Sequence, residues 1–258
     1  NFLMIDKHRY ALARGRSSNI NDQDRTIDKF VTDRFIEIIL EQKKIFNRAL
    51  IIGDKDNFTE LQLNLIGIMD VTHINISKEI NSKKIHILPD NEIIPDLGSY
   101  DLIIGLSLIN FLDDIPNFLK QLKELLSPEG LMLHNFFSEN NLLELKEMFS
   151  KVELEVYNGI SQRFMPVIDI RDIGDLINNL GFTDTVILRE NFKCFYSTFR
   201  EMLTHLRLMA CTNFLKVKEN KYINKHFINN LLIFFENKKI DRLFKLSFDI
   251  LIISSWKK

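Results

Sequence analysis

The segment YDLIIGLSLINFLDDIPNFLKQLKELLSPEGLMLHNFF, residues 100–137, contains the pattern that decides the fold. It opens on YDLIIGLSL, a continuous apolar run typical of a strand that is buried on both faces. IPNFLKQLKELLSPEG then has apolar residues at helical spacing and is closed by Pro128 and Gly130, and LMLHNFF is a second apolar run. This order predicts two parallel strands joined by a helical crossover.

The alternation of strands and helices continues on both sides of this segment. Before it, RALIIG, VTHINIS and KKIHIL are typical of strands, and DRTIDKFVTDRFIEIIL and NFTELQLNLIGIM are helical. After it, TDTVILREN and FDILIISSW are typical of strands, and the other stretches are helical: NLLELKEMF, DIRDIGDLINNLGF, STFREMLTHLRLMAC and NKHFINNLLIFFENK. The chain is therefore predicted to be α/β, with one mostly parallel sheet covered on both faces. The two late strands suit an antiparallel strand at one edge.

Composition excludes several classes of protein. The 258 residues are 45% hydrophobic and 27% charged, which is ordinary for a globular protein, and the net charge of −1 favours neither nucleic acid nor acidic lipid. No apolar run reaches the roughly 18 residues of a membrane span, and NFLMIDKHRYALARGR does not resemble a signal peptide. Cys194, Cys211 and the six histidines have no metal-ligand spacing. We expect a reduced, cytoplasmic chain without a metal.

The succession of elements resembles the class I S-adenosylmethionine-dependent methyltransferases, a family with a seven-stranded Rossmann-like sheet. Four further stretches are similar to one subgroup: MIDKHRYALARGR, PVIDIRDIGDLINNLGF, LTHLRLMACTNFL and FDILIISSWK. This subgroup contains the malonyl-carrier-protein methyltransferases of the biotin pathway and a respiratory complex I assembly factor that is an arginine hydroxylase. The resemblance implies a helical lid over residues 1–45 and an α/β domain over 46–258, with a helical insertion before the last strand.

The stretch ALIIGDKDN, residues 49–57, stands where the family has its glycine-rich cofactor loop. Ile51 takes the place of the acid that holds the methionine amino group of the cofactor. Gly53 matches the first glycine, whereas Lys55 and Asn57 replace the other two. Asp54 and Asp56 add negative charge where the cofactor carboxylate would lie. Alternatively, the loop is only a capped turn, because NFTE has the form of a capping box with Asn57 as N-cap and Glu60 three residues later.

Other cofactor contacts also follow from the resemblance. Asn75 takes the place of the acid that binds the ribose hydroxyls, and it has one acceptor oxygen where a carboxylate has two. Asp90 matches the acid that binds the adenine amino group, and its alternative role is that of an exposed turn residue. Asn110 and Phe111 replace the subgroup's His-Trp pair, so an amide stands where an imidazole could move a proton. Asp113 and Asp114 are the acids of the next turn and suit helix capping.

The resemblance also implies substrate-side residues. Tyr10 and Arg14 lie in the proposed lid, together with Arg9 and Arg16; the alternative is a frayed basic N-terminus. Arg163 lies where relatives contact the substrate, and Phe111 suits an apolar wall. The apolar stripe of the helical stretch at residues 199–215 is more typical of core packing than of a binding groove.

Together these substitutions predict a methyltransferase-like protein with an eroded cofactor site. We expect S-adenosylmethionine to bind weakly or not at all, because charged hydrogen-bond partners are lost at more than one position. Three functions stay open: a methyltransferase with an altered site, a non-catalytic assembly factor, and a hydroxylase of the same subgroup. The resemblance implies a protein partner, either a respiratory complex subunit or a carrier protein.

Overall fold

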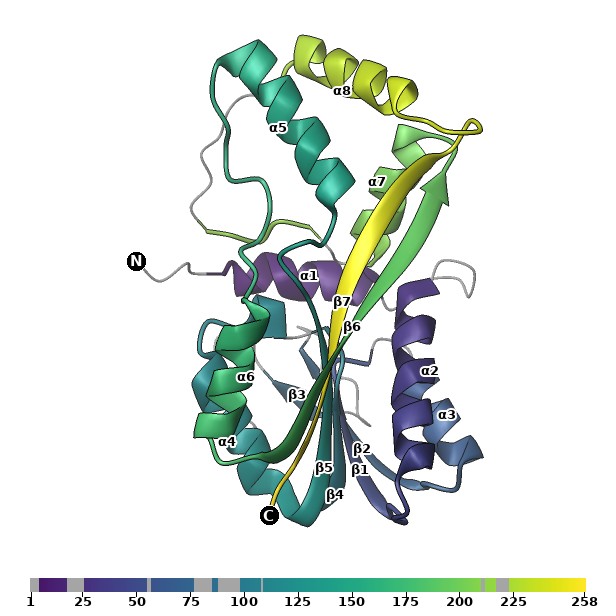
Figure 1. Ribbon diagram of the computed structural model, residues 1–258, viewed down its shortest axis with the longest axis vertical. Coiled ribbons are helices and arrows are strands. Elements are labelled where there is room, and N and C mark those ends of the chain that lie inside the picture. The colour runs from purple at the N-terminus through teal and green to yellow at the C-terminus, as the bar shows by residue number, and fades with distance from the viewer. Residues whose placement is uncertain are drawn as a thin grey trace.

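The computed structural model describes residues 5–17, 26–54, 57–76, 85–87, 98–107, 109–209, 212–216 and 223–258. Seven strands form one sheet in the order β3-β2-β1-β4-β5-β7-β6 (Figure 1). The strands are β1 Arg48–Ile52, β2 Asp70–Ile76, β3 Ile85–Ile87, β4 Tyr100–Gly105, β5 Leu126–Phe137, β6 Thr183–Tyr196 and β7 Phe244–Trp256. The seven-stranded α/β fold predicted from the sequence is therefore confirmed.

Helices cover both faces of the sheet. α2 and α3 lie on one face and α4 and α6 on the other (Figure 1). The helices of the described chain are α1 Lys7–Ser17, α2 Thr26–Glu41, α3 Phe58–Leu65, α4 Ile115–Leu125, α5 Leu143–Tyr157, α6 Ile170–Asn179, α7 Phe199–Leu208 and α8 Lys225–Asn237, with a short 3-10 turn η2 at Ile109–Phe111. The helix expected to end near Gly130 ends at Leu125, because β5 begins directly after it.

The two apolar runs expected at the centre of the sheet lie next to each other there. β1 pairs in parallel with β4, and Ile51 lies opposite Ile104. Alternate side chains enter opposite layers, so that Ile51 joins the core under α2 while Leu50 and Ile52 join the core under α4. Burial on both faces explains why both strands are continuous apolar runs in the sequence.

The antiparallel strand does not lie at the edge of the sheet. β7 runs antiparallel between β5 and β6, and β6 forms the edge. The edge prediction was wrong because the last strand inserts beside β5 instead of adding beyond β6. Burial agrees with this order: β7 is buried along almost its whole length, whereas β6 alternates between half-buried and exposed residues.

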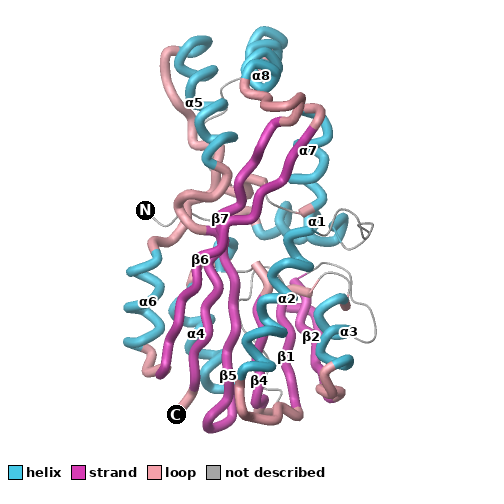
Figure 2. The backbone as a smooth tube through the Cα atoms, turned by 45° about the vertical axis from the view of Figure 1, so that its right-hand side comes forward, coloured by secondary structure: helices cyan, strands magenta, loops and turns pink. Residues whose placement is uncertain are grey.

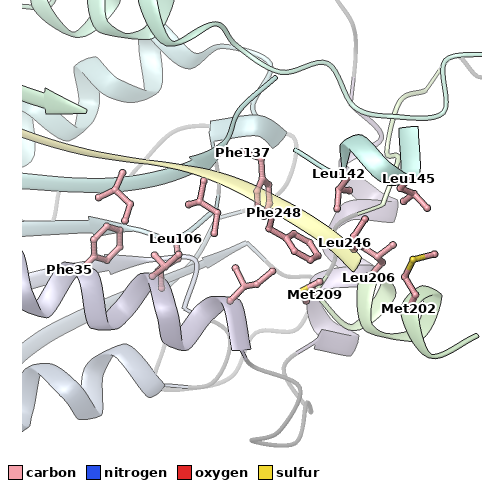
Figure 3. Close-up of a cluster of buried hydrophobic side chains, with 14 of the residues drawn as sticks. Phe35, Leu106, Phe137, Leu142, Leu145, Met202, Leu206, Met209, Leu246 and Phe248 are labelled. Atoms are coloured by element: carbon pink, nitrogen blue, oxygen red, sulfur yellow. The ribbon is translucent and has the colours of Figure 1, made fainter. Parts of the chain in front are cut away.

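The β6–β7 ribbon continues beyond the end of β5 and carries a second group of helices. β6 and β7 pair from Thr183 to Tyr196, and this ribbon extends toward α5, α7 and α8 (Figure 2). Apolar side chains continue without a break from the sheet into this group. Phe35 and Leu106 lie at one end of the close-up, and Leu145, Leu206 and Met202 lie at the other (Figure 3). One hydrophobic core therefore joins both parts of the molecule.

The proposed lid segment contains two helices with different surroundings. α1 lies across the carboxyl ends of the parallel strands, between the sheet and the upper helices (Figure 1). α2 instead packs on the sheet, where Val31 and Phe35 are fully buried in the main core. The division at residue 45 stays a prediction, but only α1 has the position of a lid.

Candidate functional site

Two described residues of the loop after β1 have a left-handed backbone. Gly53 has φ 87° and Asn57 has φ 66°, both in the left-handed region that glycine favours and asparagine tolerates. The N–H of Gly53 donates to the carbonyl of Ile74 at 3.0 Å, which ties the loop to β2. Lys55 and Asp56 lie outside the described residues. At Asn57 the substitution has therefore preserved the conformation of a glycine.

The capping box expected at the start of α3 is wrong. Asn57 makes no side-chain cap hydrogen bond, because its left-handed backbone differs from the extended conformation of an N-cap residue. The carboxylate of Glu60 points elsewhere and lies 2.9 Å from Nε2 of His73 on β2. The alternative of a turn that binds no cofactor therefore loses its capping box, and the role of the loop stays a prediction.

Arg14 of α1 reaches the cofactor-type loop. Its guanidinium donates to the main-chain carbonyl of Gly53, and its side chain is buried. Asp54, the next residue, is also buried. Arg14, predicted to belong to a lid, is thus in direct contact with Gly53, predicted to belong to a cofactor loop, although 39 positions separate them in the sequence.

The remaining predicted cofactor residues have different outcomes. Ile51 is fully buried in the core. Asn75 lies in β2 opposite His86 of β3, at the carboxyl end of the strand, where the resemblance places it. Asp90 lies outside the described residues. The roles of Asn75 and Asp90 toward a cofactor stay predictions.

The turn after β4 is held by two buried asparagines. Asn110 accepts from the main-chain N–H of Phe137 at 2.7 Å and donates to the Phe137 carbonyl at 3.1 Å. Asn135 accepts from the N–H of Ser107 at 2.9 Å and donates to the Ser107 hydroxyl at 3.0 Å. The amide of Asn110, a predicted cofactor contact, is therefore engaged within the protein. Asn135 was not predicted, since nothing local marks it.

Aromatic rings join α1 to the turn after β4. The rings of Tyr10 and Phe111 stack with centroids 4.6 Å apart, and Phe214 meets both rings edge-on. The N–H of Ile5 donates to Asp113 at 3.0 Å, so Asp113 anchors the segment before α1. Asp114 caps α4 by accepting from the N–H of Asn117. The stacked rings thus bring together a predicted lid residue, Tyr10, and a predicted wall residue, Phe111.

Arg163 lies beside a pocket of about 760 Å³ between α5, α7 and the turn η2. Its Nε donates to Glu153 at 2.7 Å, and Ser161 donates to the same carboxylate through both its N–H and its hydroxyl. Although Glu153 is deeply buried, these hydrogen bonds and the charge of Arg163 lower the pKa of its carboxyl. Phe111 and Asn110 line the same pocket, so it adjoins the ends of the strands.

Comparison with known proteins assigns the fold to a family. A model described as "Methyltransferase domain" matches residues 34–186, which is more than half of the chain. The chain belongs to the methyltransferase-domain family. Among solved structures, the YcgJ protein of Bacillus subtilis has a TM-score of 0.53 at 9% identity, over 89% of this chain and 99% of that chain. This structural likeness shows that the two chains share a fold.

Curated relatives of this methyltransferase-fold protein come from the expected subgroup. The mitochondrial arginine-hydroxylase NDUFAF5 of Rattus norvegicus is 22% identical over 191 residues, 71% of this chain and 56% of that protein. The malonyl-[acyl-carrier protein] O-methyltransferase 2 of Ilyobacter polytropus is 23% identical over 201 residues, 74% of this chain and 77% of that protein. The chain thus spans about half the length of the first of these relatives.

The described part of this methyltransferase-fold protein contains neither a metal-type cluster nor a membrane-spanning helix. No cluster of three or more His, Cys, Asp or Glu side chains is arranged there to hold a metal ion. None of the helices described is both long and apolar enough to cross a membrane.

His134 gives the methyltransferase fold a pH-dependent stability. It is completely buried on β5, and burial lowers its pKa from 6.5 to about 3. The unfolded chain binds this proton below pH 6.5 and the folded chain does not, so stability is full above pH 6.5 and falls as the pH decreases toward 3. From pH 7.5 to pH 5 we expect His134 to account for a loss of about 2 kcal/mol.

Urea unfolding of the intact chain and of His134→Leu at both pH values measures this loss. Leucine cannot titrate, so the variant should lose about 2 kcal/mol less than the unmodified chain over the same interval. Equal losses in the two proteins would contradict the assignment to His134.

Proposed function

We propose that the protein binds S-adenosylmethionine weakly at the carboxyl ends of β1, β2 and β4 and supports methyl transfer to an acceptor in the adjoining pocket. One observation carries the weak affinity. Ile51 stands in the place of the family's acid and is fully buried in the core under α2. The ammonium group of the cofactor therefore gains no acceptor from this residue. A lost charged hydrogen bond weakens binding by roughly tenfold to a hundredfold.

Other features favour retained, rather than abolished, binding. The positive φ angles of Gly53 and Asn57 are the backbone conformation that glycines allow in a ligand-binding turn. Arg14 brings a cation to this loop, where it suits the carboxylate of the cofactor, whereas the buried Asp54 disfavours that carboxylate. Methyl transfer needs few catalytic side chains, because the sulfide released from the sulfonium is already a good leaving group and the protein has mainly to position the two reactants.

The charges of the pocket favour one kind of acceptor. Lys146, Arg163 and Arg207 line it, and no acidic residue is among the described residues of its wall. A cationic arginine, which the name of the rat relative gives as a substrate, would be repelled there. An acid bound to a carrier protein, as named for the Ilyobacter relative, suits these charges better. We therefore propose a carrier protein as partner ahead of a respiratory complex subunit.

Calorimetric titration with S-adenosylmethionine tests the cofactor part of the proposal. We expect a dissociation constant in the high-micromolar range, about a hundredfold weaker than a few micromolar, because the ammonium group loses its charged acceptor. S-adenosylhomocysteine, which lacks the sulfonium but keeps the ammonium group, serves as control and should bind with similar weakness. A dissociation constant of a few micromolar or tighter would contradict the eroded site.

A further inference from the structure

The pocket beside η2 is much larger and more apolar than a small polar acceptor requires. Its volume of about 760 Å³ lies in the range of about 300–1,000 Å³ that is typical of sites for drug-sized ligands. Four phenylalanines line it: Phe111, Phe137, Phe149 and Phe164. The apolar wall is completed by four leucines: Leu142, Leu145, Leu203 and Leu206. Such a wall gains most from burying a long hydrocarbon or aromatic body.

Two of the three cations around this apolar wall form no ion pair in the described chain. Within the described chain, neither Lys146 nor Arg207 forms an ion pair, and Arg207 is exposed. The amine of Lys146 donates only to the main-chain carbonyl of Glu139, at 2.9 Å. The Glu139 carboxylate itself pairs with Arg189 at 3.2 Å.

Arg163 adds a third cation with spare hydrogen-bonding capacity. Glu153 takes its Nε, and the guanidinium lies over the rings of Phe149 and Phe227, 5.8 Å and 5.0 Å from their centroids. Its Nη2 is buried by protein atoms and has no hydrogen-bond partner in the described structure, so the attraction of Arg163 for a ligand in the pocket is that of its charge.

We propose that this pocket binds an amphiphilic anion, that is, a molecule with a carboxylate at one end of an apolar body. The apolar wall takes the body, and Lys146, Arg163 and Arg207 attract the carboxylate. The inference rests on the proposed function only in treating this ligand as the methyl acceptor. Binding itself does not require the cofactor, so the two proposals are tested separately.

Calorimetric titrations of the full chain without cofactor test the charge preference. Decanoate should bind at one site, and decyltrimethylammonium, which has the same chain and the opposite charge, should bind at least tenfold more weakly. In the double variant Lys146→Gln/Arg207→Gln, decanoate affinity should fall about tenfold while the affinity for neutral decanol stays unchanged. Lys120→Gln removes an exposed charge from α4 on the other face of the sheet and should change nothing.

A second variant tests the location. Leu203 of α7 is half-buried and lines the pocket, so Leu203→Trp should abolish binding of decanoate and decanol alike, with a melting temperature confirming the fold. The proposal is overturned by absence of decanoate binding at millimolar concentration, by equal affinity for the cationic chain, or by a folded Leu203→Trp that binds normally. None of these results bears on the titration with S-adenosylmethionine.

Discussion

Replacing Ile51 by aspartate should cost about 4 kcal/mol of stability at pH 7. The change restores the residue type of the family, but the side chain here is completely buried and belongs to the core under α2. Its strand is flanked on both sides, with His73 opposite on β2 and Ile104 opposite on β4. A carboxylate that loses its hydration in such a layer is strongly disfavoured, and its pKa rises.

Two matched variants separate the causes of this loss. Ile51→Val removes one methylene and should cost only about 1 kcal/mol, whereas Ile51→Asn buries a polar group of the same shape as aspartate without its charge. Urea unfolding at pH 7 gives the stabilities, and calorimetry gives the cofactor affinity. An aspartate variant that stays within 1 kcal/mol of the unmodified chain and binds the cofactor more tightly would mean that this side chain reaches the ligand.

The central sheet was predictable because burial on both faces leaves a simple trace in the sequence. β1 and β4 contain unbroken apolar runs, and they are adjacent at the centre of the sheet. The order of the last strands was harder to predict, since pairing depends on contacts between segments far apart in the chain. Still, a cue was present: β7 contains the unbroken apolar run ILII, residues 250–253, whereas the burial of β6 alternates along its length, as in an edge strand.

Residues of the candidate site could be predicted only where the resemblance to the methyltransferase family indicated their positions in the sequence. Tyr10 and Phe111 are 101 residues apart in number, yet their rings stack. No local periodicity encodes such a contact. The role of Asn57 was mistaken because asparagine suits both an N-cap and a left-handed backbone, and the sequence does not distinguish between these conformations.

Asn110 illustrates a further limit. Its two hydrogen bonds to Phe137 depend on the residue at which β5 ends, and strand ends are the least reliable part of a sequence-based prediction. In the structure, the amide of Asn110 forms hydrogen bonds with the main chain of Phe137 at the end of β5. Its contact with a cofactor stays a prediction.

Gly105→Ala should destabilise the protein by at least about 3 kcal/mol, because His134 occupies the space of the missing side chain. A Cβ at position 105 would lie 1.8 Å from Cε1 of the imidazole and 2.0 Å from Nδ1. The two residues lie directly opposite each other on β4 and β5. The ring has no exposed surface and meets Phe118 edge-on, with centroids 6.3 Å apart, so it has little room to move away.

A double-mutant cycle tests this contact. His134→Ala alone should cost about 3 kcal/mol through the cavity it leaves, but Gly105→Ala should cost almost nothing more in that background, because the new methyl group enters the cavity. The expected coupling is therefore about 3 kcal/mol, measured by urea unfolding at pH 7.5, where the histidine is neutral. Gly174→Ala in α6 is the matched control: its Cβ would make only an ordinary 3.5 Å contact with Ile187, so the variant should be as stable as the unmodified chain or up to about 1 kcal/mol more stable. Additive losses from Gly105→Ala and His134→Ala would show that the imidazole is free to rotate out of the way, and that the glycine is needed for some other reason.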